Sequence, residues 1–221
     1  MYSSMKISGC LFDMDGVIVD SAKHHFTAWK MLADELSIPF TLDDNKLLKG
    51  LSRIDSLEKI LSLGSLELNS NTKLLLMEKK NALYLYLVSK MSEYEILPGV
   101  KDLILELKRE GVKVCLGSSS KNATVILKNV NLFNLFDGIV DGNHITLSKP
   151  DPEVFLKGAE ILGVSPSECV VFEDAASGVE AALSGGFFAL GIGDASELSR
   201  ANFVVSDLCG MSLEKLNQIT G

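Results

Sequence analysis

The chain has few basic residues for its size and no long apolar run. Its 221 residues include 21 Lys and Arg against 29 Asp and Glu, a formal net charge of −8. Affinity for nucleic acid comes largely from Lys and Arg on phosphates, so this balance argues against a nucleic-acid partner. A transmembrane helix needs about 18 consecutive apolar residues, and no stretch of the chain approaches that length. We therefore expect no membrane-spanning segment.

Targeting signals and cysteine motifs are also missing. The N-terminal stretch MYSSMKISGCLFDMD lacks the basic and then apolar regions of a signal peptide, and Asp13 would interrupt them. The four cysteines form no CxxC pair, and Cys10, Cys115 and Cys169 each stand in an apolar, strand-like run. This context favours buried, reduced thiols over a disulfide or a zinc site. We expect a soluble, cytoplasmic protein.

What the chain does contain is a set of five apolar segments that predict strands. They lie at 7–12 (ISGCLF), 112–118 (VKVCLGS), 168–173 (ECVVFE), 187–192 (FFALGI) and 202–206 (NFVVS). Continuous apolar runs suit a parallel sheet that is covered on both faces. Helical patterns at 99–111, 151–163 and 177–186 separate most of them, and the second begins with Asp151 as a cap and Pro152 at the first helical position. The alternation predicts an α/β fold with a Rossmann-like, doubly wound parallel sheet.

Residues 20–93 interrupt this alternation. They contain no convincing strand, and apolar residues recur with helical spacing at 22–38, 41–50, 55–63 and 71–88. Pro98 stands near the return to the strand–helix pattern. We therefore predict an α/β core domain of residues 1–19 and 94–221, with an inserted α-helical cap domain at 20–93.

Polar side chains follow three of the predicted strands. Asp13 and Asp15 follow the first, Ser118–Asn122 the second, and Glu173 and Asp174 the third. Ligands of parallel α/β sheets bind at the carboxyl ends of the strands. Several carboxylates at one place repel one another, so their ionised forms cost free energy unless a cation is bound. Carboxylate oxygens are hard ligands, which suit Mg²⁺. The predicted metal ligands are Asp13, Asp15, Glu173 and Asp174.

The same strand ends predict phosphoryl chemistry. Mg²⁺, Lys149 and the Ser118 hydroxyl together would bind a phosphoryl group. Asp13 would attack phosphorus, as in aspartyl-phosphate enzymes, and Asp15 would act as the acid or base on the other oxygen. Each motif alone is also typical of a solvated turn, a serine-rich loop or an acidic helix cap. Their occurrence at three successive strand ends favours a catalytic site.

Four motifs, in order, resemble those of the haloacid dehalogenase superfamily. DMDGVIVD resembles the first motif, GSSSKN the second, SKPDP the third with its lysine, and VVFEDAASG the acidic fourth. The resemblance implies an aspartate nucleophile at Asp13 and a helical cap inserted after the first motif. Asp15 favours phosphatases and phosphomutases, whose ester oxygen needs a proton, over dehalogenases, which release halide.

The insertion is similar to the cap of the β-phosphoglucomutase family. DSAKHHFTAW resembles its hinge and first cap helix, KGLSRIDS its substrate loop, and KKNALY, which includes Asn81 and Tyr84, its later cap helix. This implies interconversion of β-D-glucose 1-phosphate and glucose 6-phosphate through an aspartyl phosphate and a 1,6-bisphosphate. Such a mutase needs a second phosphate site, for which Lys49 and Arg53 in the insertion are candidates, with Lys121 and Asn122 on the core side.

The site residues that follow fall into two groups. Catalytic residues are Asp13, Asp15, Ser118 and Lys149, and substrate-binding residues are His25, Trp29, Lys49, Gly50, Leu51, Ser52, Arg53, Ser56, Lys80, Ser119, Ser120, Lys121 and Asn122. Ser21 and its neighbours are the predicted hinge. Two alternatives stay open: a sugar-phosphate phosphatase of the same fold, and a non-catalytic phosphate-sensing module. The identity of the sugar rests on the resemblance alone. The expected partner is a small sugar phosphate, bound by a monomer.

Overall fold

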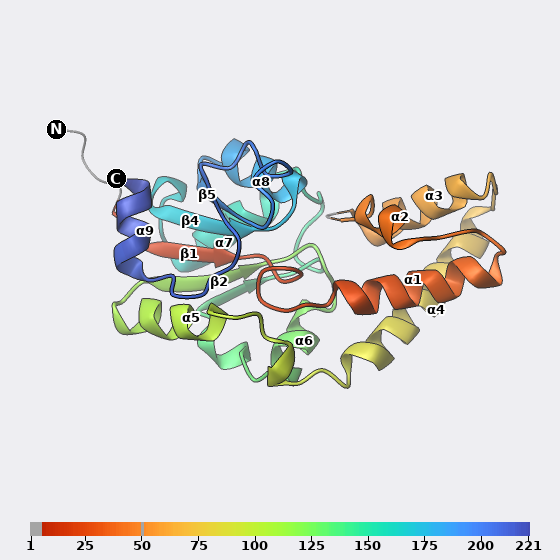
Figure 1. The fold of residues 1–221 in the computed structure, drawn as a ribbon, viewed down its shortest axis with the longest axis horizontal. Helices are drawn as coiled ribbons and strands as arrows, with labels where there is room; N and C mark the ends of the chain where they lie inside the picture. The colour runs from red at the N-terminus through yellow and green to blue at the C-terminus, as the bar shows by residue number, and fades with distance from the viewer. Residues whose placement is uncertain (1–5, 50) are drawn as a thin grey trace.

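Six parallel strands form one sheet in this computed structural model, which describes residues 6–49 and 51–221 (Figure 1). The strand order is β3-β2-β1-β4-β5-β6. Their bounds are β1 (Gly9–Phe12), β2 (Lys113–Gly117), β3 (Gly138–Val140), β4 (Cys169–Glu173), β5 (Phe188–Ile192) and β6 (Phe203–Val205). Phe12 pairs with Leu116 of β2 and with Phe172 of β4, so these three strands end at nearly the same level. The residues that follow them therefore meet at one edge of the sheet.

The five predicted strands are confirmed, but the sheet also contains β3, which the sequence analysis did not predict. This strand pairs with β2 at the edge of the sheet and has only three residues, Gly138–Val140. Only Ile139 and Val140 are bulky and apolar in this strand, and Asp137 and Asp141 flank it, so it shows no apolar run that predicts a strand.

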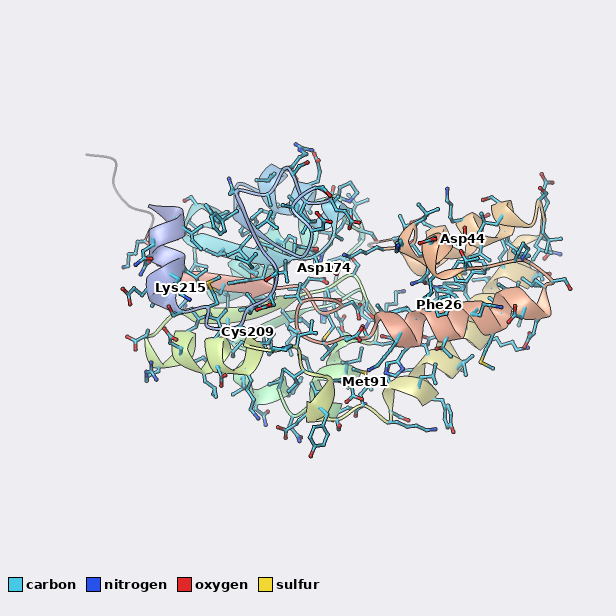
Figure 2. All side chains as sticks on the ribbon, viewed as in Figure 1. Phe26, Asp44, Met91, Asp174, Cys209 and Lys215 are labelled. Carbon is cyan, nitrogen blue, oxygen red and sulfur yellow. The ribbon has the colours of Figure 1, made fainter. Side chains whose placement is uncertain are left out.

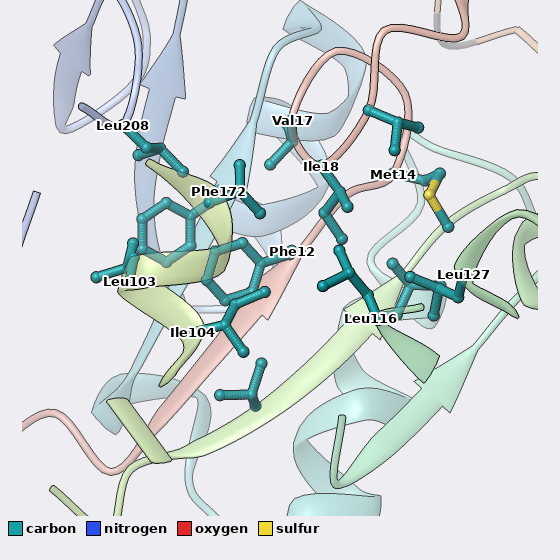
Figure 3. Packing of buried hydrophobic residues seen from close by; sticks show 14 of the residues in the cluster. Phe12, Met14, Val17, Ile18, Leu103, Ile104, Leu116, Leu127, Phe172 and Leu208 are labelled. Atoms are coloured by element: carbon teal, nitrogen blue, oxygen red, sulfur yellow. The ribbon is translucent and has the colours of Figure 1, made fainter. Parts of the chain in front are cut away.

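Helices cover both faces of the sheet. α5 (Val100–Arg109), α6 (Ala123–Asn129) and α9 (Leu213–Thr220) share one core with alternate strand residues, and α7 (Glu153–Leu162) and α8 (Ala176–Ser184) share another with the remaining ones. Successive side chains of a strand point to opposite faces, so Phe12 lies in the first core and Leu11 in the second. In the first core Phe12 stacks on Phe172 with ring centroids 4.3 Å apart (Figure 3). The doubly wound fold is confirmed.

Short turns of 3₁₀ helix complete the connections at η1 (Glu93–Glu95), η2 (Phe133–Leu135) and η3 (Pro166–Glu168). One helix start differs from its prediction: α7 begins at Glu153, and Pro152 is the residue before it. Asp151 does act as a cap, since its Oδ1 accepts the N–H of Glu153 at 2.9 Å.

The segment between β1 and α5 contains four helices, which we call the helical insertion. They are α1 (Ala22–Glu35), α2 (Leu42–Lys46), α3 (Arg53–Leu63) and α4 (Ser70–Val88). Three of them begin at a polar cap, because Thr41, Ser52 and Asn69 each accept a backbone N–H with the side chain. The insertion lies beyond one end of the sheet (Figure 1) and has a core of its own, which includes Trp29 and Leu57.

The insertion also touches the core of the sheet. Ala28, Tyr84 and Val88 are fully buried in the cluster that contains Phe12. Within residues 6–49 and 51–221, the helices are too short or too polar to cross a bilayer.

Three cysteines lie inside the sheet's two cores. Cys10, Cys115 and Cys169 are buried free thiols, whereas Cys209 is exposed. Burial raises the pKa of all three buried thiols, to about 12 for Cys115 and Cys169. They therefore remain protonated at neutral pH, and the prediction that they are buried is confirmed.

Candidate active site

Three carboxylates converge where β1 and β4 end. Asp13 directly follows β1, and its N–H donates to the Phe172 carbonyl at 3.0 Å. Glu173 is the last residue of β4, and Asp174 follows it. The carboxylate oxygens of Asp13, Glu173 and Asp174 lie within 4.8 Å of one another. Asp174 stands at the end of the sheet that faces the helical insertion (Figure 2).

A buried lysine joins two of these acids. The Nζ atom of Lys149 lies 2.6 Å from Asp13 Oδ1 and 2.6 Å from Glu173 Oε1, and it also donates to the Gly117 carbonyl at 3.1 Å. Burial disfavours the ammonium ion, but the charges of Asp13 and Glu173 outweigh that effect and raise the pKa of Lys149. Lys149 is therefore a permanent cation between two acids.

The protein partners of these acids do not fully offset the cost of burying their negative charge. Burial raises the pKa of Glu173, although Lys149 opposes the rise, and burial also raises the pKa of Asp174, where Lys49 opposes it. Carboxylate oxygens at this spacing match the hard ligands that Mg²⁺ prefers. Asp13, Glu173 and Asp174 therefore fit a divalent cation.

The Asp15 side chain lies apart from this trio. It accepts a hydrogen bond from the Ser21 hydroxyl, and its Oδ2 is 3.9 Å from His25 Nε2. Burial, and then the charge of Asp13, raise the pKa of Asp15 to about 6. Its role as a metal ligand stays a prediction.

Two glycines shape the space around the acids. A Cβ atom at Gly178 would overlap the Glu173 carboxylate, and one at Gly16 would overlap that of Asp174. Gly16 also has a φ of +81°, which side-chain-bearing residues rarely adopt. Both acids thus occupy volume that only glycine leaves free.

The loop after β2 is held by its own hydrogen bonds. Ser118 is 1% exposed, and its Oγ accepts the Ser120 N–H at 3.1 Å. The Ser120 Oγ in turn accepts the Asn122 N–H at 3.2 Å. The buried Ser119 hydroxyl has no hydrogen-bond partner among the described residues. Lys121 is exposed.

On the insertion side, Arg53 faces an amide. Its Nη2 donates to Asn81 Oδ1 at 2.7 Å, and Asn122 Nδ2 donates to the same oxygen at 2.8 Å. Burial lowers the pKa of Arg53. Arg53 takes part in none of the ion pairs found among the described residues. This positive charge is therefore available to an anion.

A second cationic group lies between α1 and α4. Lys80 is 3% exposed, its Nζ lies 2.9 Å from His25 Nδ1, and it stands 4.7 Å from the ring centroid of Trp29. Burial, followed by the charge of Arg53, lowers the pKa of Lys80 to about 7. Burial also keeps the pKa of His25 well below its ordinary value. Tyr84 packs on His25 with ring centroids 4.1 Å apart.

Lys49 lies beside the acidic cluster. Its Nζ is 2.9 Å from Asp174 Oδ2, and the two side chains are 44% and 14% exposed. A cavity of about 290 Å³ adjoins this pair and is also lined by Gly16 and Ser206. Lys49 thus joins the helical insertion to a candidate metal ligand.

The remaining predicted residues lie near the start of α3. Leu51 is exposed, Ser56 is buried, and the Ser52 side chain caps the helix by accepting the Asp55 N–H at 3.2 Å. Gly50 lies outside the described residues. Sequence patterns assign no role to Asn81, although it adjoins Lys80, because spacing cannot show which groups its amide contacts.

Fold and site together define a class of protein. The sequence profile of the haloacid dehalogenase-like hydrolases matches residues 7–186, and the chain belongs to this family. It is 42% identical to the β-phosphoglucomutase of Bacillus subtilis over 210 residues, 94% of this chain and 93% of that protein. The phosphorylated carbohydrates phosphatase of Thermotoga maritima is 33% identical over 181 residues, 80% of each chain. The crystal structure of β-phosphoglucomutase from Clostridium difficile superposes with a TM-score of 0.93 at 35% identity and covers 97% of both chains.

Proposed function

We propose that this enzyme is a phosphomutase that interconverts β-D-glucose 1-phosphate and glucose 6-phosphate. The observation that carries the proposal is that two separate groups of cationic and amide side chains, each suited to a phosphate, occur in one chain. Lys149 beside Asp13 forms the first, and Arg53 with Asn122 forms the second. A phosphatase needs one phosphate site, whereas an enzyme that turns over a bisphosphate needs two. The similarity to two β-phosphoglucomutases supports the same activity.

In the proposed reaction Asp13 begins as an aspartyl phosphate. The hydroxyl oxygen at C6 of glucose 1-phosphate attacks phosphorus, the bond between phosphorus and Asp13 breaks, and Asp15 accepts the hydroxyl proton. The resulting 1,6-bisphosphate binds again with its ends exchanged. Asp13 then attacks the phosphorus at C1, and Asp15 returns its proton to the sugar oxygen as that bond breaks. Glucose 6-phosphate leaves, and Asp13 carries a phosphoryl group once more.

Other residues hold the transferring group. We assign Ser118 and the backbone of Ser119 to its oxygens, with Lys149 as the fixed positive charge. Asp13, Glu173 and Asp174 would hold Mg²⁺, and the predicted set adds Asp15. When bound, this ion offsets negative charge on the phosphoryl oxygens.

The helical insertion supplies the other end of the site in this proposal. Residues 20–93 act as a cap domain on the core of 1–19 and 94–221, and the cap closes about the hinge at Ser21. Arg53, Lys121 and Asn122 bind the distal phosphate. Sugar contacts come from His25, Trp29, Leu51, Ser52, Ser56, Ser120 and Lys80. Closure excludes water, which otherwise hydrolyses the aspartyl phosphate.

A sugar-phosphate phosphatase is the second candidate, since the relatives include a phosphatase of phosphorylated carbohydrates and a phosphatase of fructose 1-phosphate. The deciding experiment assays several sugar phosphates for both isomer and free phosphate, with Mg²⁺ and a bisphosphate primer varied. We expect β-glucose 1-phosphate to be isomerised only when primer is present. Steady release of phosphate without isomer would identify a phosphatase, and Mg²⁺-dependent binding without turnover would identify a sensing module.

We further propose that the enzyme works in the cytoplasm as a monomer. The buried free thiols of Cys10, Cys115 and Cys169 suit a reducing compartment. All the residues assigned here come from one chain.

A further inference from the structure

One side-chain oxygen links the helical insertion to the sheet. Asn81 lies on α4, Arg53 is the first residue of α3, and Asn122 directly precedes α6 on the core side. Asn81 Oδ1 accepts from Arg53 Nη2 at 2.7 Å and from Asn122 Nδ2 at 2.8 Å. A guanidinium can only donate, so the accepting atom must be the amide oxygen of Asn81. Two donors from distant parts of the chain thus meet on one acceptor.

The geometry leaves both donors able to bind a ligand. A guanidinium has five N–H groups and a primary amide has two, and Asn81 takes one from each. The remaining N–H groups belong to side chains that already stand within hydrogen-bond distance of a common point. A phosphate oxygen accepts the same donors as an amide oxygen does.

The chemistry of an amide also matters. A carboxylate at position 81 would hold Arg53 by charge, and in doing so it would cancel the positive charge that a phosphate needs. Asn81 orients the guanidinium without neutralising it. Arg53 is only partly exposed, and its partial burial makes an unneutralised charge more effective toward an anion.

We propose that Asn81 is a positioning residue for the distal phosphate, holding Arg53 and Asn122 together before the sugar phosphate arrives. This role rests on the proposed function, which assigns Arg53 and Asn122 to that phosphate. Preorganised donors lose less conformational freedom on binding, so the contribution of Asn81 appears as affinity. Asn81 itself touches neither the reacting phosphorus nor Asp13 in this scheme.

The test is a set of kinetic measurements with β-glucose 1-phosphate, Mg²⁺ and glucose 1,6-bisphosphate as primer. We expect Asn81→Ala to raise KM about tenfold, which is the effect on affinity of losing one to two hydrogen bonds. The change in kcat should be much smaller. Arg53→Ala should raise KM further. The double variant Arg53→Ala/Asn81→Ala should have a KM increase smaller than the product of the two single increases, because Asn81 acts partly through Arg53. Asn71→Ala, an exposed asparagine on the same helix, is the matched control.

Each outcome decides between positioning and its alternatives. A KM of wild-type size in Asn81→Ala, or increases that multiply in the double variant, would overturn the proposal. If Asn81→Ala does not fold, Asn81→Asp takes its place, because aspartate keeps the size and the accepting oxygen of asparagine. We expect its negative charge to raise KM while the Tm stays at the wild-type value. An unchanged KM in Asn81→Asp would overturn the proposal. Wild-type isomerisation is measured in parallel. A wild type that releases phosphate and makes no isomer contradicts the proposed function and, with it, the role of Asn81 at a distal phosphate. A wild type that isomerises, with an unchanged KM in Asn81→Ala, contradicts the role of Asn81 alone.

Discussion

The Lys149 side chain is a buried cation held between two acids. It is 3% exposed, and Asp13 and Glu173 stand 2.6 Å from its Nζ on either side. A buried ion pair need not stabilise a protein more than apolar packing does, but removal of one partner leaves an uncompensated charge. Here the removal of Lys149 would leave three acids within 4.8 Å of one another with one cation fewer.

Lys149→Met tests this balance. In metal-free buffer we expect the free energy of unfolding to fall by about 3–5 kcal/mol, because Asp13 and Glu173 lose their shared partner. Mg²⁺ should then raise the Tm of the variant more than that of the wild type, since the ion replaces part of the missing charge. The measurement is thermal unfolding with and without Mg²⁺.

Lys101→Met, which breaks an exposed pair with Glu93, is the control and should leave the Tm close to that of the wild type. If Mg²⁺ raised the Tm of the wild type and of Lys149→Met by the same amount, the expectation would be contradicted.

Among the elements, the start of α7 organises the segment that carries Lys149. Glu153, in the first turn, accepts the N–H of Thr146 at 2.9 Å and of Leu147 at 2.7 Å, and it pairs with Lys157 at 2.6 Å. Its carboxylate therefore joins the chain before Lys149 to the helix after it. The Lys157 hydrogen bond and then the Leu147 N–H lower the pKa of Glu153 to about 2.

Glu153→Gln should have a pH-dependent cost. A carboxyl whose pKa is lower in the folded state than its ordinary value of about 4.3 stabilises the fold above that pH, and this stabilisation is lost as pH falls toward 2. The Tm of Glu153→Gln should lie below that of the wild type at pH 6, and the difference should vanish near pH 2. Glu78→Gln, on the exposed side of α4, provides the comparison. A Tm difference that stays constant with pH would rule out the carboxylate charge as its cause.

The elements also show which features a sequence can predict. Apolar runs predicted β1, β2, β4, β5 and β6. Even the short β6 consists of Phe203, Val204 and Val205, whereas β3, which is equally short, begins with Gly138 and is flanked by two aspartates. The meeting of Asp13 with Asp174 followed from the rule that parallel strands end together. By contrast, the pairing of Lys49 with Asp174 and the bridge at Asn81 depend on how the helical insertion sits against the sheet. Local patterns carry no information on that long-range packing.

In the molecule as a whole, two of the polar links between the helical insertion and the sheet lie at the candidate site. One is the hydrogen bond from Asn122 to Asn81, and the other is the ion pair of Lys49 with Asp174. The Lys49 ammonium pairs with Oδ2 of Asp174, which is a candidate metal ligand. A divalent cation bound by Asp174 would therefore compete with the Lys49 ammonium.

Lys49→Met should bind Mg²⁺ more tightly than the wild type. We expect a gain of up to about fivefold, since a partly exposed ion pair contributes roughly 1 kcal/mol or less. Calorimetric titration of the metal-free protein with MgCl₂ measures the affinity directly, and Lys49→Arg, which keeps the charge, should resemble the wild type. Weaker binding by Lys49→Met would mean that Lys49 assists the ion.

The space that Gly178 leaves for the Glu173 carboxylate limits which sequences can carry this acidic strand end. In a saturation library at codon 178, selection for activity should return glycine alone, because even the methyl group of alanine would push the Glu173 carboxylate off Lys149. Deep sequencing before and after selection would measure this, and survival of alanine at a glycine-like frequency would refute it. A position that touches no substrate would then be as intolerant of change as the nucleophile.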